Sequence, residues 1–115
     1  MTTPQSSLSA RSEARQVAPK LVDLSERVLY GDVWEREQLS KRDRSLVTVA
    51  ALIAMSRADQ LRGHVERALG NGVTREELGE VITHLAFYAG WPAAMTAARV
   101  TKQVFDEQRA REDRS

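Results

Sequence analysis

The chain has 115 residues and a mass of 12.9 kDa, which fits one ordinary domain and is too small for two. Apolar residues make up 42% and charged residues 29%, with a formal net charge of +1, so nucleic acid and membrane lipid are not expected as partners. The absence of cysteine excludes disulfides, thiolate nucleophiles and cysteine-ligated metals.

Residues 1 to 12 hold several serines and almost no large apolar side chain, so they predict a flexible arm. Pro19 is a favourable residue for the first turn of a helix. Apolar residues around it recur at helical spacing and predict one amphipathic helix that ends near residues 30 and 31. These residues are Val17, Leu21, Leu24 and Val28.

A second helix is predicted from Ser40 to Met55. Ser40 and Asp43 have the spacing of a capping box, in which each residue satisfies a backbone donor at the start of the helix. The residues that follow are apolar on nearly every side except at Thr48. This pattern predicts a central helix that is buried all round.

Three more helices are expected after residue 58. Asp59 is the predicted cap of the first, which should end at the sequence Gly-Asn-Gly, residues 70 to 72. Thr74 and Glu77 form a second capping box before another apolar stripe, which Gly90 ends. Pro92 favours the start of the last helix.

No segment alternates like a strand, so the fold is predicted to be all-α with about five helices. The helical domain is expected over residues 13 to 110. Residues 111 to 115 are polar and are expected to form a frayed tail.

His64 and His84 are the only histidines, and each lies at the margin of an apolar stripe on its predicted helix. An imidazole at such a margin suits a general acid with a pKa near neutrality, and a hydrogen-bonded structural histidine is the alternative. There is no histidine-rich metal motif and no glycine-rich phosphate loop, so neither a metal nor a nucleotide cofactor is expected.

Five of the six aromatic residues lie in two short segments, 30 to 34 and 87 to 91, each built around a glycine. They could line a ligand pocket or fill gaps in the core, and in either case the two segments are expected to be neighbours. The basic residues near 41 to 62 are interpreted as a solvated surface, since a DNA-reading helix would carry fewer acidic residues than residues 59 to 70 do.

Several blocks of sequence together resemble the carboxymuconolactone decarboxylase family. The resemblance runs from about Tyr30 to Phe105. It rests on GDVW at 31 to 34, RSLVTVAALIA at 44 to 54, the turn from Arg57 to Leu61 followed by His64, NGVTREEL at 71 to 78 and THLAFYAGWPAA at 83 to 94.

The resemblance implies an all-helical fold like that of alkylhydroperoxidase D, usually assembled as a homo-oligomer of trimers or hexamers. The surplus of apolar helix surface in so short a chain agrees with such an assembly. In the peroxidase branch two cysteines precede the shared histidine. Here Arg57 and Gln60 stand in their places before His64, so thiol peroxidase chemistry is not expected.

The family's decarboxylases act without a cofactor on a carboxylated γ-lactone, so the resemblance implies a carboxy-lyase with a small anionic substrate. Loss of CO₂ requires a donor at the developing oxyanion, a proton for carbon and a cation for the substrate's second carboxylate. The implied roles fall on His64 and His84 as catalytic residues, on Arg44 or Arg57 as the cation, and on Trp34 and Tyr88 as an apolar wall.

Some residues depart from the family pattern. Glu37 and Gln38 stand where a Pro-Gly is usual, and Glu66 adds a negative charge near the implied site. Alternatives are therefore a paralogue with another substrate in a biosynthetic pathway and a non-catalytic oligomer that binds a small acid. The start of the sequence has no leader-like pattern, and a cytoplasmic protein, active in the catabolism of aromatic compounds, is expected.

Overall fold

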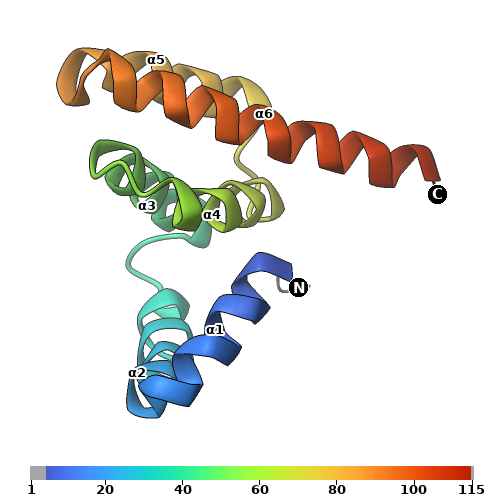
Figure 1. Ribbon diagram of the computed structural model, residues 1–115. Helices are drawn as coiled ribbons and strands as arrows, with labels where there is room; N and C mark the ends of the chain where they lie inside the picture. Colours follow the sequence, from blue (N-terminus) through green and yellow to red (C-terminus); the bar gives the residue numbers. More distant parts are fainter. Residues whose placement is uncertain (1–4, 115) are drawn as a thin grey trace. The chain divides into compact units, whose positions relative to one another are not determined.

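The computed structural model describes residues 5 to 114, which form helices and no strands, as the sequence predicts (Figure 1). Six segments are α-helical, one more than the predicted count. They are α1 (Gln5–Val17), α2 (Pro19–Leu24), α3 (Lys41–Ala54), α4 (Ala58–Gly70), α5 (Arg75–Ala89) and α6 (Trp91–Arg114), with a π-helical segment η1 (Ser25–Tyr30) after α2 and a 3₁₀ turn η2 (Val33–Glu35) before α3.

The contacts divide the chain into two compact units, one up to Arg44 and one from Ser45 onward, where the sequence predicts a single domain over residues 13 to 110. In the part of the chain that the structure describes, no helix is both long and apolar enough to cross a membrane.

Residues 5 to 12, which the sequence places in a flexible arm, belong to α1; residues 1 to 4 lie outside the described part, and the flexibility of the arm remains a prediction. Exposed side-chain contacts connect α1 to α2 and η1, and composition alone does not reveal them. Arg15 binds Asp23 at 3.1 Å and Glu26 at 3.2 Å, and the guanidinium of Arg11 lies 5.6 Å from the centre of the Tyr30 ring.

The apolar stripe of the first predicted helix is exposed in the structure. Pro19 interrupts the helix, because Ala18 before it has a non-helical backbone with φ −137° and ψ 67°. The chain then widens into the π-helix, where the regular period of 3.6 residues no longer holds. Val22 and Trp34 are buried in this unit, whereas Val17, Leu21, Leu24 and Val28 are exposed.

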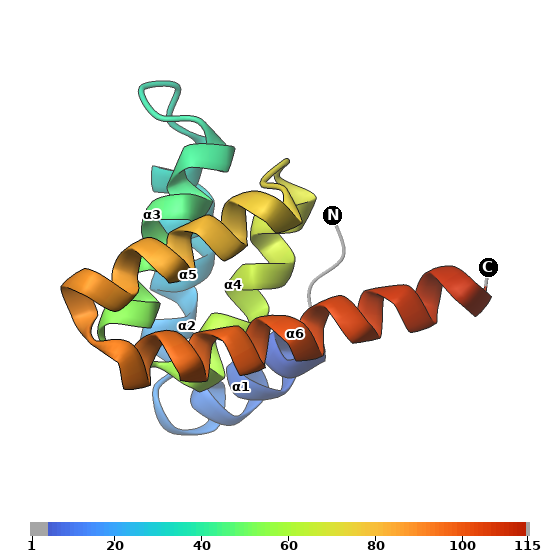
Figure 2. The ribbon, with the colours of Figure 1, turned by 90° about the horizontal axis from the view of Figure 1, so that it is seen from above.

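In the second unit, α5 and α6 pack against each other and α4 packs against α6 (Figure 2). Arg62 of α4 also forms an ion pair with Glu107 of α6. The buried core draws on each of α3 to α6 and on the loop after α4. It consists of Val49, Ile53, Leu61, Val65, Ala68, Val73, Leu78, Ala97, Val100 and Val104.

The helix ends follow the predicted local signals closely. The hydroxyl of Ser40 accepts from the backbone N–H of Asp43 at 3.0 Å. Thr74 and Glu77 form the reciprocal capping box, with bonds of 3.0 Å and 2.9 Å. One predicted cap is wrong: Arg57 is the N-cap of α4, and Asp59 lies in its first turn, where its charge still suits the helix dipole.

The prediction that the helix up to Met55 is buried all round is also wrong. Val49 and Ile53 of α3 are buried, but Val47 is 62% exposed and Met55 is exposed too. An apolar pattern indicates that burial of a face is favourable, but it does not show that other parts of the same chain bury that face. At the other end, the predicted frayed tail is helical as far as Arg114.

Candidate active site

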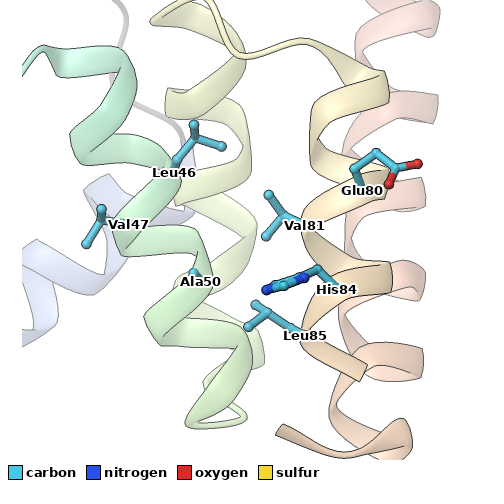
Figure 3. Close-up of a pocket in the computed structure, with 7 residues that line it drawn as sticks. All are labelled: Leu46, Val47, Ala50, Glu80, Val81, His84 and Leu85. Carbon is cyan, nitrogen blue, oxygen red and sulfur yellow. The ribbon is translucent and has the colours of Figure 1, made fainter. Parts of the chain in front are cut away.

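A groove of about 480 Å³ runs between α3 and α5, and His84 lies in it (Figure 3). The imidazole of His84 points from α5 toward α3, beside Leu85. The other lining side chains are mostly apolar: Leu46, Val47 and Ala50 from α3, and Glu80, Val81 and Leu85 from α5. The groove therefore places one imidazole, which can donate or accept a proton, in mostly apolar surroundings.

The ring of His84 is supported by Tyr88, one helical turn further along α5. Their ring centres are 4.7 Å apart and their planes are inclined by 34°. Residues four apart on a helix lie on the same side, so this contact follows from the helix itself. Tyr88 is exposed, so the pair lies at the surface of the unit.

The charged groups at the groove are acidic. Glu80 lies one turn before His84, and its carboxylate points away from α3 (Figure 3). An adjoining hollow of about 490 Å³ is lined by Leu46 and Val81 together with Glu76, Glu77 and Glu80. Neither the groove nor this hollow is lined by Lys or Arg. An anionic substrate in the groove would therefore need a cation from elsewhere.

His64 lies on α4 and is not among the residues that line the His84 groove. Burial, and to a smaller extent the nearby positive charge of Arg67, lower its pKa to about 4. The expectation of a pKa near neutrality is thus wrong for His64, because the stripe margin where it lies is largely covered by protein. At neutral pH His64 is uncharged. A pocket shared by the two histidines remains a prediction.

The two candidate arginines have different surroundings. Arg44 donates from its side chain to the backbone carbonyls of Leu39 at 3.1 Å and Arg36 at 3.4 Å, so it holds the loop before α3. Arg57 is the exposed N-cap of α4. Its backbone N–H donates to the carbonyl of Leu52 at 2.9 Å, which fixes the turn between α3 and α4.

The aromatic candidates lie in different units. Trp34 is buried in the first unit and its ring centre is 5.7 Å from that of Tyr30. In the second unit, Phe87 meets Trp91 edge to face at 5.6 Å. The structure shows ring contacts within each of the two aromatic segments. That the two segments are neighbours remains a prediction.

Sequence reasoning did not select Glu80 as a residue of the site. Its spacing of four from His84 was the available signal, since it puts the two on one side of α5. Among the described residues, no group of three or more His, Asp or Glu side chains is arranged to hold a metal ion.

The fold and the site together describe a small all-α protein with an imidazole in an apolar groove. Residues 19–103 match the model of a protein family. The chain belongs to the carboxymuconolactone decarboxylase family. The resemblance stated from the sequence blocks is thereby confirmed.

Three relatives are similar to the chain over about 80 residues. The 4-carboxymuconolactone decarboxylase of Acinetobacter baylyi is 44% identical over 70% of this chain and 60% of its own length. The nitrosuccinic acid decarboxylase npaB of Metarhizium robertsii is 35% identical over 68% of this chain and 54% of its own. An uncharacterized 15.0 kDa protein of Paracoccus denitrificans, from the nqo9-nqo10 intergenic region, is 31% identical over 69% and 60%. The chain thus spans only a little over half the length of these relatives.

Proposed function

We propose that the protein is a decarboxylase of small organic acids that needs no cofactor. The observation that carries the proposal is the imidazole of His84 inside the apolar α3–α5 groove (Figure 3). Such a ring can deliver a proton to carbon once CO₂ has left, and the apolar walls favour departure of the charged group from the substrate. Two relatives that are named decarboxylases support the same class of reaction.

The substrate proposed first is a γ-lactone with a carboxylate on a ring carbon conjugated to the lactone carbonyl. The bond from the ring carbon to the carboxylate breaks, and its electron pair moves through the ring double bond onto the carbonyl oxygen. A proton then returns to carbon as the oxyanion collapses. The protein has to stabilise that oxyanion and supply that proton.

His84 is the proposed proton donor to carbon, with its ring oriented by Tyr88. His64 is the proposed hydrogen-bond donor to the oxyanion. Because its pKa is near 4, it is a neutral imidazole at neutral pH and can donate an N–H without carrying a charge. The sequence left open which histidine protonates carbon and which stabilises the oxyanion, and we assign the two roles in this way.

Arg57 is the cation proposed for the substrate's second carboxylate. Its side chain is exposed at the start of α4, whereas Arg44 donates to the loop carbonyls of Leu39 and Arg36. A guanidinium can hold a carboxylate through two parallel hydrogen bonds. The acidic residues beside His84, Glu80 above all, would keep that carboxylate away from the groove and orient the lactone.

A nitro acid is a second candidate substrate, favoured by the relative named nitrosuccinic acid decarboxylase. A nitro group beside the leaving carboxylate takes up the electron pair as the lactone carbonyl would. The requirements on the protein are the same: an apolar place for the carboxylate that leaves, a donor at the new oxyanion and a proton for carbon.

The proposal is tested by measuring CO₂ release from 4-carboxymuconolactone and from nitrosuccinic acid with the purified, chelator-treated protein. We expect turnover of one of them, because the groove supplies the proton without a metal. A protein that binds these acids but releases no CO₂ from either would be a binding protein and would contradict the proposal. Turnover that appears only when a metal is added would contradict the cofactor-free mechanism.

A further inference from the structure

The buried face of α3 ends in a hydroxyl group. The buried residues of this helix are Ser45, Val49 and Ile53, which are spaced four apart and so lie on one side of it. Val49 and Ile53 belong to the hydrophobic core, whereas Ser45 is polar and 0% exposed. A hydroxyl removed from water destabilises a fold unless it has a hydrogen-bond partner. The position therefore requires a polar group from another part of the chain.

That polar group is the side-chain amide of Asn71. Nδ2 of Asn71 donates to Oγ of Ser45 at 3.0 Å, although the two residues are 26 apart in sequence. Asn71 is half-buried and is the C-cap of α4. Apolar packing has no direction, so Val49 and Ile53 alone would let α3 slide along its own axis. A hydrogen bond depends on distance and angle, so this one fixes the start of α3 against the end of α4.

The loop that follows Asn71 connects the same point to α5. Gly72 has a φ of 98°, and the backbone N–H of Val73 donates to the carbonyl of Ala68 at 2.9 Å. This is the Schellman arrangement, which ends a helix in one defined direction. Val73 is buried, and Thr74 begins the capping box of α5. The loop is therefore fixed by hydrogen bonds or burial from the end of α4 to the start of α5.

Ser45 lies beside one end of the His84 groove. Figure 3 shows α3 and α5 side by side, with Leu46 of α3 facing Val81 of α5. Leu46 directly follows Ser45 and, together with Val81 and Glu80, lines both the groove and the adjoining hollow. A shift of α3 along its axis would move Leu46 past Val81 and change the shape of the groove beside His84. The position of α3 along its axis relative to α5 is called its register below.

We propose that the hydrogen bond between Ser45 and Asn71 sets the register of α3 against α5, and with it the shape of the groove in which His84 acts. Neither Ser45 nor Asn71 lines the groove, so both are positioning residues that act through the α3 wall. Displacing a reacting group by about 1 Å can cost roughly 10²-fold in rate. The effect on catalysis rests on the proposed function, whereas the register itself does not.

The test separates positioning from simple stabilisation with two variants. Ser45→Ala removes the acceptor of the Asn71 amide and should lower the urea midpoint. In Ser45→Ala/Asn71→Leu both polar groups are replaced by apolar ones, which should return much of the lost stability. A merely stabilising bond would let turnover return as well. We expect kcat for CO₂ release to stay roughly tenfold or more below wild type in both variants, with a smaller change in KM.

Val104→Ala is the matched control for stability. Val104 is fully buried on α6 and does not line the groove, so the cavity should lower the urea midpoint without changing the α3 wall. All rates are compared at a temperature where circular dichroism shows each variant folded. If the double variant regains no stability, its kcat is judged against Val104→Ala. An equal loss of kcat in Val104→Ala would overturn the proposal, as would a double variant with the wild-type kcat.

Methyl NMR spectra report on the groove without any turnover. Val81 and Leu85 lie on the α5 wall, away from the substituted residues in sequence. We expect their methyl signals to shift in both Ser45 variants, because the opposite wall has moved. Unchanged signals would overturn the proposed register. Asn71→Ala, which removes the donor, should repeat the shifts and stands in if either Ser45 variant does not fold.

The proposed function and the proposed register fail separately. If wild type releases no CO₂ from either acid, the proposed function falls, and the methyl signals still decide whether the hydrogen bond sets the register. If wild type is active and the methyl signals shift while kcat stays within twofold of wild type, the claim that this register serves catalysis is wrong. Shifted signals together with a lowered kcat in the double variant support both parts.

Discussion

At the scale of single residues, His64 and His84 show how the same side chain differs with its surroundings. His84 is exposed on α5 beside Tyr88, while His64 is largely covered on α4 and its pKa is lowered to about 4. Helical spacing predicted correctly that each lies at the margin of an apolar stripe. It could not predict how deeply each margin is covered, because that depends on side chains from other helices.

The lowered pKa of His64 predicts a dependence of stability on pH. Between pH 6.5 and about 4 the unfolded chain takes up a proton at this residue and the folded chain does not, so stability falls as pH decreases through that window. His64→Gln, which does not titrate, should lose less stability between pH 7 and pH 4.5. The expected difference is roughly 1 kcal/mol, less than the full shift implies because the side chain is partly in water.

Urea unfolding of wild type and His64→Gln at pH 7 and pH 4.5 measures this difference. The carboxylates change the free energy of unfolding by the same amount in the two proteins, so their contribution cancels. Equal losses would contradict the assignment, as would an NMR titration of His64 near pH 6.5.

At the scale of elements, the capping box of α5 holds the helix that carries Glu80, His84 and Tyr88. Thr74→Ala removes the hydroxyl that accepts from the backbone N–H of Glu77 and should lower the free energy of unfolding by about 1 kcal/mol. Thr83→Ala is the matched control on the same helix, because the Thr83 hydroxyl only donates to a carbonyl inside the helix, that of Gly79. A Thr74 variant as stable as the Thr83 variant would show that the cap contributes nothing.

Local signals explain which elements the sequence predicts well. Ser40, Thr74 and the two glycines at 72 and 90 act on their immediate neighbours, and the helix ends fall where these residues indicate. Predictions of burial, which depend on residues distant in sequence, were less accurate. The stripe around Pro19 and the apolar pattern of α3 indicate faces whose burial is favourable. A pattern along one helix does not show whether another part of the chain packs on that face, and much of both faces is exposed.

At the scale of the whole molecule, the family is evident from ordered blocks of sequence, and the match over residues 19–103 confirms it. The candidate site is only partly predictable. His84 and Tyr88 meet because they are one turn apart. The groove depends on packing between α3 and α5, which are far apart in sequence. Its acidic border, formed by Glu76, Glu77 and Glu80, lies on α5 itself, the helix that carries His84.

The most direct test of the central claim, that His84 donates the proton in a cofactor-free decarboxylation, is the rate of CO₂ release by His84→Gln relative to wild type. Glutamine keeps a hydrogen-bond donor in the groove but cannot relay a proton near neutral pH. The account predicts a fall in kcat of roughly 10² or more, with unchanged circular dichroism and urea midpoint. A folded His84→Gln variant that turns over at the wild-type rate would contradict it.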